Sequence, residues 1–185
     1  MANFTQKAIK ESFLKLLNEK PLSRISVRDI VEDCGINRNS FYYHFRDIPT
    51  LLEEIIVEEM NGIIEKYPTV TSLDECFDAA FSFAVEHKKA AAHIFNSVSR
   101  DVFERELMKL CTYAVTAYVD TAFAQQQIRP EDRRIFIHFI KCECFGLMID
   151  WLGSNMEDAA IADLHRLTEL CRGLSQQLIC RSLEK

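Results

Sequence analysis

The sequence predicts an all-α protein, and three observations support this fold class. Its 185 residues include only five glycines and four prolines, too few for a turn-rich β design. Hydrophobic residues make up 48% of the chain, which is enough to bury a core. Apolar side chains recur at the helical period in almost every segment, and no stretch alternates between apolar and polar residues as a half-buried strand would.

The first helix is expected over about residues 3–19. Ile9, Phe13 and Leu17 place apolar side chains on one of its faces. Pro21 cannot continue a helix, so this one ends just before the proline.

Short helices with recognisable caps follow. A serine, an asparagine and an aspartate each stand where a side chain can accept a hydrogen bond from the amides of the next helix. They are Ser26, Asn37 and Asp47, before helices over about 26–34, 37–45 and 48–67. Gly35 separates the first two helices, at a position where glycine adopts a left-handed backbone easily. These elements have the dimensions of a helix-turn-helix.

Five further helices are expected, over about 72–87, 89–97, 101–126, 131–152 and 157–182. The last carries apolar residues in steps of four and three, as does a helix that packs lengthwise on a near-parallel neighbour. These residues are Ala160, Leu164, Leu167, Cys171, Leu174 and Leu178. The helix over 131–152 is apolar on more than one face, so one neighbour cannot cover it. We expect a homodimer through residues 131–152 and 157–182; burial inside one chain is the alternative.

Charge divides the chain into two parts. Residues 1–47 hold eight Lys/Arg against six Asp/Glu, whereas residues 48–185 hold fourteen against twenty-two. Such asymmetry indicates separate tasks. We expect one domain over 1–47, with the helix-turn-helix, and a helical ligand-binding and dimerisation domain over 48–185.

Several protein classes find no support in the residues present. No signal peptide or membrane anchor is expected, because no apolar run approaches the ~20 residues that span a bilayer. The seven cysteines are scattered through helical segments and are expected to be reduced thiols of a cytoplasmic protein. We expect neither an enzyme nor a metal or other cofactor, because no nucleophile–base set, zinc-ligand spacing or phosphate-cradling glycine loop is present.

The segment Gly35–Phe45, GINRNSFYYHF, concentrates aromatic hydrogen-bonding side chains. On a helical wheel Phe41 and Phe45 share one face, which we expect to be buried. The opposite side carries Asn39, Ser40, Tyr42 and Tyr43, with His44 at its margin and Arg38 able to reach past the helix end. Asn and Arg can pair with base edges, whereas Tyr and His suit phosphate oxygens. A solvated helix face is the alternative, although such faces favour Lys and Glu.

Residues Thr5 to Ile56 resemble the DNA-binding region of TetR/AcrR-type regulators. The resemblance rests on TQKAIKESFLKLL, ISVRDIVEDCGINRNSFYYHFRD and LLEEII, and above all on Tyr42-Tyr43-His44-Phe45. It implies a helical homodimer with two N-terminal headpieces on double-stranded DNA. By position it implies phosphate contacts from Ser26, Tyr42 and His44, base contacts from Arg28, Arg38, Asn39 and Ser40, and either from Tyr43. Asn37 and Arg46 complete the candidate DNA-binding residues.

One position departs from the family. Where this chain has Ile48, the family often has a lysine that contacts a phosphate at the start of the fourth helix. Isoleucine cannot make that contact, and Arg46 is the candidate replacement.

The segment FGLMIDWLGSNMEDAAIADLHRL resembles one C-terminal class of the same family, which includes dihydroxyacetone kinase operon activators. The candidates for lining a ligand cavity are Phe81, Phe95, Met108, Cys111, Phe139 and Phe145, with His93 as the polar group. Plain core is the alternative for the apolar residues, and a hydrogen-bonded or exposed histidine for His93. Sparse charges favour a neutral or mildly polar ligand.

These observations predict a ligand-responsive transcriptional regulator, with repression as the expected sign. It would bind a palindromic DNA operator as a homodimer and respond to a small-molecule effector. The alternative is a small-molecule-binding co-regulator that keeps the fold but does not bind DNA.

Overall fold

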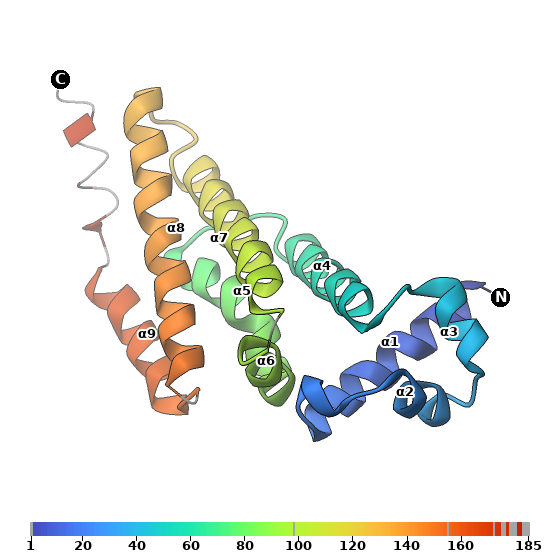
Figure 1. Cartoon of the computed structure of the whole chain (residues 1–185). Helices are drawn as coiled ribbons and strands as arrows, with labels where there is room; N and C mark the ends of the chain where they lie inside the picture. Colours follow the sequence, from blue (N-terminus) through green and yellow to red (C-terminus); the bar gives the residue numbers. More distant parts are fainter. Residues whose placement is uncertain are drawn as a thin grey trace. The chain divides into compact units, whose positions relative to one another are not determined.

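The structure, a computed structural model, describes residues 2–97, 99–154, 156–171, 173–174, 177 and 181–182. These residues form α-helices and one 3-10 helix, with no strand among them, which confirms the predicted fold class (Figure 1). The chain divides into two compact units. The first contains residues 1–61 and 83–106, and the second contains residues 62–82 and 107–185. The prediction that tasks divide at residue 47 concerns function and stays a prediction.

The first unit begins with a three-helix headpiece. α1 (Ala2–Glu19) is followed by η1 (Leu22–Arg24), α2 (Val27–Asp33) and α3 (Arg38–His44). The three α-helices pack against one another. Phe13, Ile30 and Phe41, one from each helix, are fully buried. The headpiece therefore has its own hydrophobic core.

The turn and caps of the headpiece form as predicted. The Oγ of Ser26 accepts a hydrogen bond from the Asp29 amide at 3.3 Å, and the Asp29 carboxylate accepts one from the Ser26 amide at 2.7 Å. Asn37 Oδ1 accepts a hydrogen bond from the Ser40 amide at 2.9 Å. Gly35 has φ 68°, the left-handed conformation expected between the two helices.

α4 (Ile48–Lys66) follows the headpiece and is tied to α1 through Lys10. The Nζ of Lys10 lies 2.5 Å from Glu58 Oε1 and 3.3 Å from Glu54 Oε2. The same ammonium group lies 5.7 Å from the centre of the Phe45 ring. One half-buried cation thus links α1, α4 and the end of α3.

α6 (Lys88–Phe95) packs against α1 and makes a specific polar contact with it. The helical partner of the Leu17 carbonyl would be the amide of residue 21, but Pro21 has none. His93 on α6 takes that place, because its Nδ1 lies 2.6 Å from the Leu17 oxygen. His93 is therefore a hydrogen-bonded histidine, which is one of the alternatives that the sequence analysis left open.

The second unit contains the end of α4 and parts of α5 (Leu73–Glu86) and α7 (Arg100–Ala122), with α8 (Pro130–Gly153) and α9 (Asp158–Leu170). Its core is aliphatic, aromatic and thiol-rich. The fully buried residues include Cys76, Leu110, Cys111, Ala114, Cys144 and Met148. The rings of Phe81 and Trp151 pack 5.2 Å apart, which joins α5 to α8.

Two predicted helices are shorter than expected. The helix predicted over 101–126 ends at Ala122, and the one over 157–182 ends at Leu170. Gly173 has φ 85°, a conformation through which an α-helix cannot continue. The four-and-three apolar repeat therefore does not lie on one continuous helix. Leu178 and the side chain of Ala160 lie outside the described residues.

The buried thiols behave as small apolar groups. The Sγ atoms of Cys111 and Cys144 lie 3.7 Å apart. Burial raises the pKa of Cys76, and the contact with Cys144 together with burial raises the pKa of Cys111. Both therefore remain protonated at neutral pH.

In the part of the chain that the structure describes, no helix combines the length and the hydrophobicity that a membrane span needs. Likewise, no three His, Cys, Asp or Glu side chains among these residues gather where they could hold a metal ion.

Candidate nucleic-acid interface and ligand pocket

α3 has two chemically different faces. Phe41 and Phe45 are buried and hold the helix in the headpiece core. The exposed side carries Arg38, Asn39, Tyr42 and Tyr43, while Ser40 and His44 lie at its margins. Arg38 is the first residue of the helix, and its side chain is in solvent.

The two tyrosines stand out from the helix with their rings supported by neighbours. Tyr43 is 79% exposed and Tyr42 is 55% exposed. The Tyr42 ring packs edge-on against Phe41 at 5.4 Å, and the Tyr43 ring packs edge-on against His44 at 5.0 Å. These contacts fix the direction of both side chains, so the phenol hydroxyls are presented to solvent at low entropic cost on binding.

The candidate arginines differ in availability. Arg38 makes no hydrogen bond or ion pair with any described residue. Arg28, by contrast, is paired with Glu32, and Arg46 is paired with Asp47 at 3.0 Å. Arg38 is therefore the candidate arginine already free to meet a base edge.

Three of the candidate DNA-binding residues also take part in the hydrogen bonds that cap the N-termini of α2 and α3. They are Ser26, Asn37 and Ser40. The hydroxyl of Ser26 donates to the Asp29 carboxylate at 2.7 Å, and the hydroxyl of Ser40 donates to Asn37 Oδ1 at 3.2 Å. The side-chain N–H groups of Asn37 remain available as hydrogen-bond donors, because these bonds use only its Oδ1. Loss of these side chains would therefore change helix stability as well as any contact with DNA.

Asp47 caps the start of α4 as the sequence predicts, and Thr50 is the partner that the sequence prediction did not include. The Asp47 carboxylate accepts hydrogen bonds from the Thr50 amide at 2.9 Å and from the Thr50 hydroxyl at 2.7 Å. A threonine three residues after the aspartate is the sequence signal for this partner. Ile48, beside Asp47, is half-buried and lines a partly open cavity, and its side chain has no charge to offer a phosphate.

The seven candidate ligand residues do not surround one cavity. His93 and Phe95 belong to the first unit, and the other five to the second. Of those five, Met108 and Phe139 line different pockets. Phe81 packs on Trp151, Cys111 lies in the thiol-rich core, and Phe145 is half-buried on α8. Which of them contacts a ligand stays a prediction.

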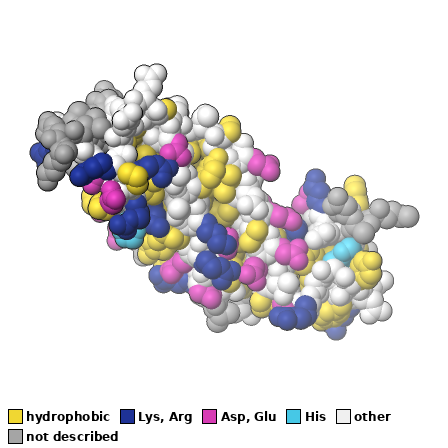
Figure 2. Space-filling model, turned by 90° about the horizontal axis from the view of Figure 1, so that it is seen from above, with side chains coloured by type: hydrophobic (Ala, Val, Ile, Leu, Met, Phe, Trp, Pro, Cys, Tyr) yellow, Lys and Arg dark blue, Asp and Glu magenta, His cyan; other side chains and the backbone are white. Residues whose placement is uncertain are grey.

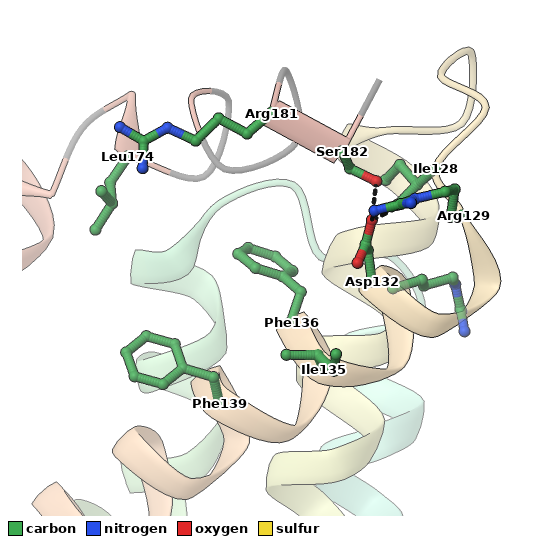
Figure 3. Close-up of a pocket in the computed structure, with 10 residues that line it drawn as sticks. Ile128, Arg129, Asp132, Ile135, Phe136, Phe139, Leu174, Arg181 and Ser182 are labelled. Atoms are coloured by element: carbon green, nitrogen blue, oxygen red, sulfur yellow. Dashed lines mark hydrogen bonds and ion pairs between the residues drawn. The ribbon is translucent and has the colours of Figure 1, made fainter. Parts of the chain in front are cut away.

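One pocket of about 630 Å³ lies between the start of α8 and described residues beyond Gly173 (Figure 3). Its apolar side is made by Ile135, Phe136 and Phe139 of α8, with Leu174 facing them. Its polar side carries Arg129, Arg133 and Arg181, together with Asp132 and Ser182. Asp132 accepts hydrogen bonds from Arg129 at 2.8 Å and from Ser182 at 2.5 Å, whereas Arg181 has no partner among the described residues.

The surface charge is mixed. On the face in Figure 2, Lys and Arg side chains are interspersed with Asp and Glu. The chain as a whole has a formal charge of −6. No continuous basic field covers the face in Figure 2.

The fold and the exposed side of α3 together define a helix-turn-helix transcriptional regulator. Residues 13–55 match the tetR family of bacterial regulatory proteins, and residues 71–172 match a transcriptional regulator C-terminal region of the same family. The chain belongs to the TetR family.

Two curated proteins are similar in sequence. The chain is 21% identical over 174 residues to YxbF of Bacillus subtilis, an uncharacterized HTH-type transcriptional regulator. It is 29% identical over 90 residues to KstR2 of Mycolicibacterium smegmatis, an HTH-type transcriptional repressor. These matches cover 86% and 44% of this chain. The chain spans less than half the length of either relative, 42% and 43%.

A solved structure shares the fold over nearly the whole chain. The dihydroxyacetone kinase operon activator DhaS matches with a TM-score of 0.69, over 90% of this chain and 97% of that one. The two sequences are 16% identical. This likeness supports the fold only.

Proposed function

We propose that the protein is a ligand-responsive repressor that binds a palindromic operator as a homodimer. The observation that carries the proposal is the exposed side of α3, where Arg38, Asn39, Tyr42 and Tyr43 face solvent on a helix that has no acidic residue of its own. Arg and Asn can read base edges, and the tyrosine hydroxyls can hold phosphates. The repressor KstR2 supports the sign of regulation.

The homodimer is proposed from apolar side chains that α8 and α9 leave in solvent. Ile135 and Phe139 on α8 are 57% and 50% exposed, and Leu170 on α9 is 68% exposed. Large apolar side chains exposed on these two helices favour an interface with a second copy of the chain. A two-fold dimer would place two α3 helices in successive major grooves, about 34 Å apart.

The effector is proposed to bind the pocket in Figure 3. Its three arginines have two acidic partners, since Arg129 pairs with Asp132 and Arg133 with Asp120. Arg181 has no acidic partner among the described residues and is therefore proposed to meet an acid on the ligand. This balance favours an apolar molecule with an acidic group over the neutral molecule expected from the sequence. Ile135 and Phe139 belong both to this pocket and to the dimer face, so bound ligand would act directly on dimer geometry.

DNA binding is tested with a duplex selected from a random pool by the full-length protein. We expect binding that weakens as salt rises, and at least a tenfold loss of affinity in the double variant Arg38→Ala, Tyr42→Ala. Lys89→Ala, which removes an exposed cation from α6, is the matched control and should leave affinity unchanged. Undiminished binding by the double variant would overturn the assignment of α3 as the reading helix.

A second candidate function has its own observation. Arg28 and Arg46 are paired with acids, and Ile48 stands where the family often has a lysine. A co-regulator that binds a small molecule but no DNA fits those three positions. If the selection enriches no duplex, and binding to any duplex is absent at low salt, this function replaces the first.

A further inference from the structure

A second cavity, of about 480 Å³, lies within the first unit. It is partly open to solvent and is lined by η1 and its flanking residues, by the start of α4, and by the end of α6 with the residues that follow it. The apolar wall is made by Pro21, Leu22, Ile25, Ile48 and Pro49. The polar wall includes His93, Asn96, Ser97 and Ser99. Among the described lining residues none is charged, so the cavity has no counter-ion for a charged occupant.

His93 offers this cavity an acceptor of fixed position. A carbonyl oxygen can only accept, so the His93 Nδ1 that faces Leu17 carries the hydrogen. In the neutral ring, Nε2 then holds a lone pair and no hydrogen. His93 makes no second hydrogen bond with a described residue. Its Nε2 is therefore available to accept a hydrogen bond from a molecule in the cavity.

Ser99 offers a second polar group. The residue is only 7% exposed, and its hydroxyl has no partner among the described residues. No completely enclosed polar side-chain atom of those residues lacks a partner, so this hydroxyl keeps some contact with open space. Ser99 is also one of the residues that line the cavity. A nearly buried hydroxyl without a partner among the described residues keeps a hydrogen bond to offer to a molecule beside it.

We infer that this cavity binds a small uncharged molecule that has one hydroxyl group on an apolar body, such as a phenol. The ligand hydroxyl donates to His93 Nε2 and accepts from the Ser99 hydroxyl, while its apolar body lies against Ile25, Ile48 and Pro49. This site goes beyond the proposed function, whose effector pocket lies in the second unit.

The same histidine links this site to the headpiece. Nδ1 holds the Leu17 carbonyl, which Pro21 leaves without a helical partner, and Nε2 holds the ligand. Both bonds use the same tautomer. Ligand binding and the contact between α1 and α6 therefore reinforce one another.

Phenol is the probe, titrated into full-length protein with 13C-labelled histidine and followed by NMR. The chain has five histidines, and the His93 signal is assigned by its loss in His93→Asn. We expect the His93 signal to shift and to saturate at millimolar phenol, on the order of 1 mM for so small a ligand. Toluene, which has the same shape without the hydroxyl, should bind at least about fivefold more weakly, the loss expected for one hydrogen bond.

Two variants separate binding from folding. Ser99→Ala should weaken the binding of phenol about fivefold and leave the binding of toluene unchanged. The control Ser82→Ala should change neither affinity. His93→Asn keeps an N–H donor for the Leu17 carbonyl but removes Nε2. With labelled isoleucine methyl groups as the probe, this variant should lose the preference for phenol over toluene.

The proposal is overturned if phenol leaves the His93 signal unmoved, if phenol and toluene bind equally, or if Ser99→Ala binds phenol as the native protein does. None of these measurements uses DNA. Their failure would leave the proposed regulator intact, and failure of operator binding would leave this site intact.

Discussion

Arg28 donates a hydrogen bond from its Nε to Glu32 Oε1 across 2.6 Å, one turn further along α2. The bond and the charge of Glu32 raise the pKa of Arg28, and both side chains are largely in solvent. The ion pair therefore keeps the guanidinium of Arg28, which is predicted to contact a base, against the surface of α2. It also places a negative charge beside the surface proposed to meet DNA.

Glu32→Gln should strengthen DNA binding. The variant frees Arg28 and removes a like charge to the phosphates, while an exposed ion pair contributes less than about 1 kcal/mol to the fold. We expect affinity for the selected duplex to rise about two- to fivefold, measured by fluorescence anisotropy. Glu65→Gln on α4, which removes an exposed acid in the second unit, should have no effect. Unchanged affinity in Glu32→Gln would mean that Arg28 does not contact DNA.

Ile48→Lys should restore a phosphate contact that the family often has. A lysine at the start of α4 adds one cation for the DNA backbone, so the slope of log affinity against log salt should steepen by about one. Ile48→Leu keeps the apolar contact and should bind DNA as the native protein does. A lysine variant with an unchanged salt slope would show that this position faces away from the duplex.

Acid should destabilise the protein through two capping aspartates. Hydrogen bonds from the Ser26 hydroxyl and amide lower the pKa of Asp29 from 3.8 to about 2, and those from Thr50 do the same for Asp47. Between these values the unfolded chain binds more protons than the folded one. The stabilisation is therefore complete above pH 3.8 and is lost as the pH falls towards about 2.

The measurement is the urea midpoint between pH 5 and pH 2.5, followed by circular dichroism. The variant Asp29→Asn, Asp47→Asn should be less stable than the native protein at pH 5 and lose less stability on acidification. Asp163→Asn, an exposed aspartate on α9, should follow the native curve. An identical pH dependence in the double variant would assign the acid sensitivity to other carboxyl groups.

Leu170→Glu should disrupt the proposed homodimer without unfolding the chain. The leucine is 68% exposed in one chain, so a charge there costs little in the monomer but is buried unpaired in the dimer. Sedimentation at micromolar concentration should give monomers for the variant and dimers for the native protein. Val85→Glu is the matched control, because Val85 is also exposed but lies on α5. Equal dimerisation by both variants would place the interface elsewhere.

Much of the headpiece could be predicted because its signals are local. A cap residue, a left-handed glycine and two aromatic residues one turn apart act within a few residues of chain, so Ser26, Gly35, Phe41 and Phe45 lie as expected. Pairing between charged side chains was harder to predict. Arg28 and Glu32 share a helix face, but whether they pair or separate depends on competing partners.

The ligand candidates could not be grouped from sequence. Whether Phe81, Met108 and Phe139 share a cavity depends on the rotation of three different helices, which periodicity does not determine. The predicted extent of the last helix was wrong for a simpler reason. An apolar repeat continues through Gly173, but the repeat specifies a face and not the backbone conformation of the glycine.

The bond from His93 to Leu17 has an evolutionary consequence. A proline at position 21 removes the amide that would serve the Leu17 carbonyl in a regular α-helix, so a donor at position 93 is favoured. The two positions are 72 residues apart in sequence, yet selection should act on them as a pair. Relatives with proline at the first position should keep a donor at the second. Relatives with any other residue at the first should be free to vary at the second.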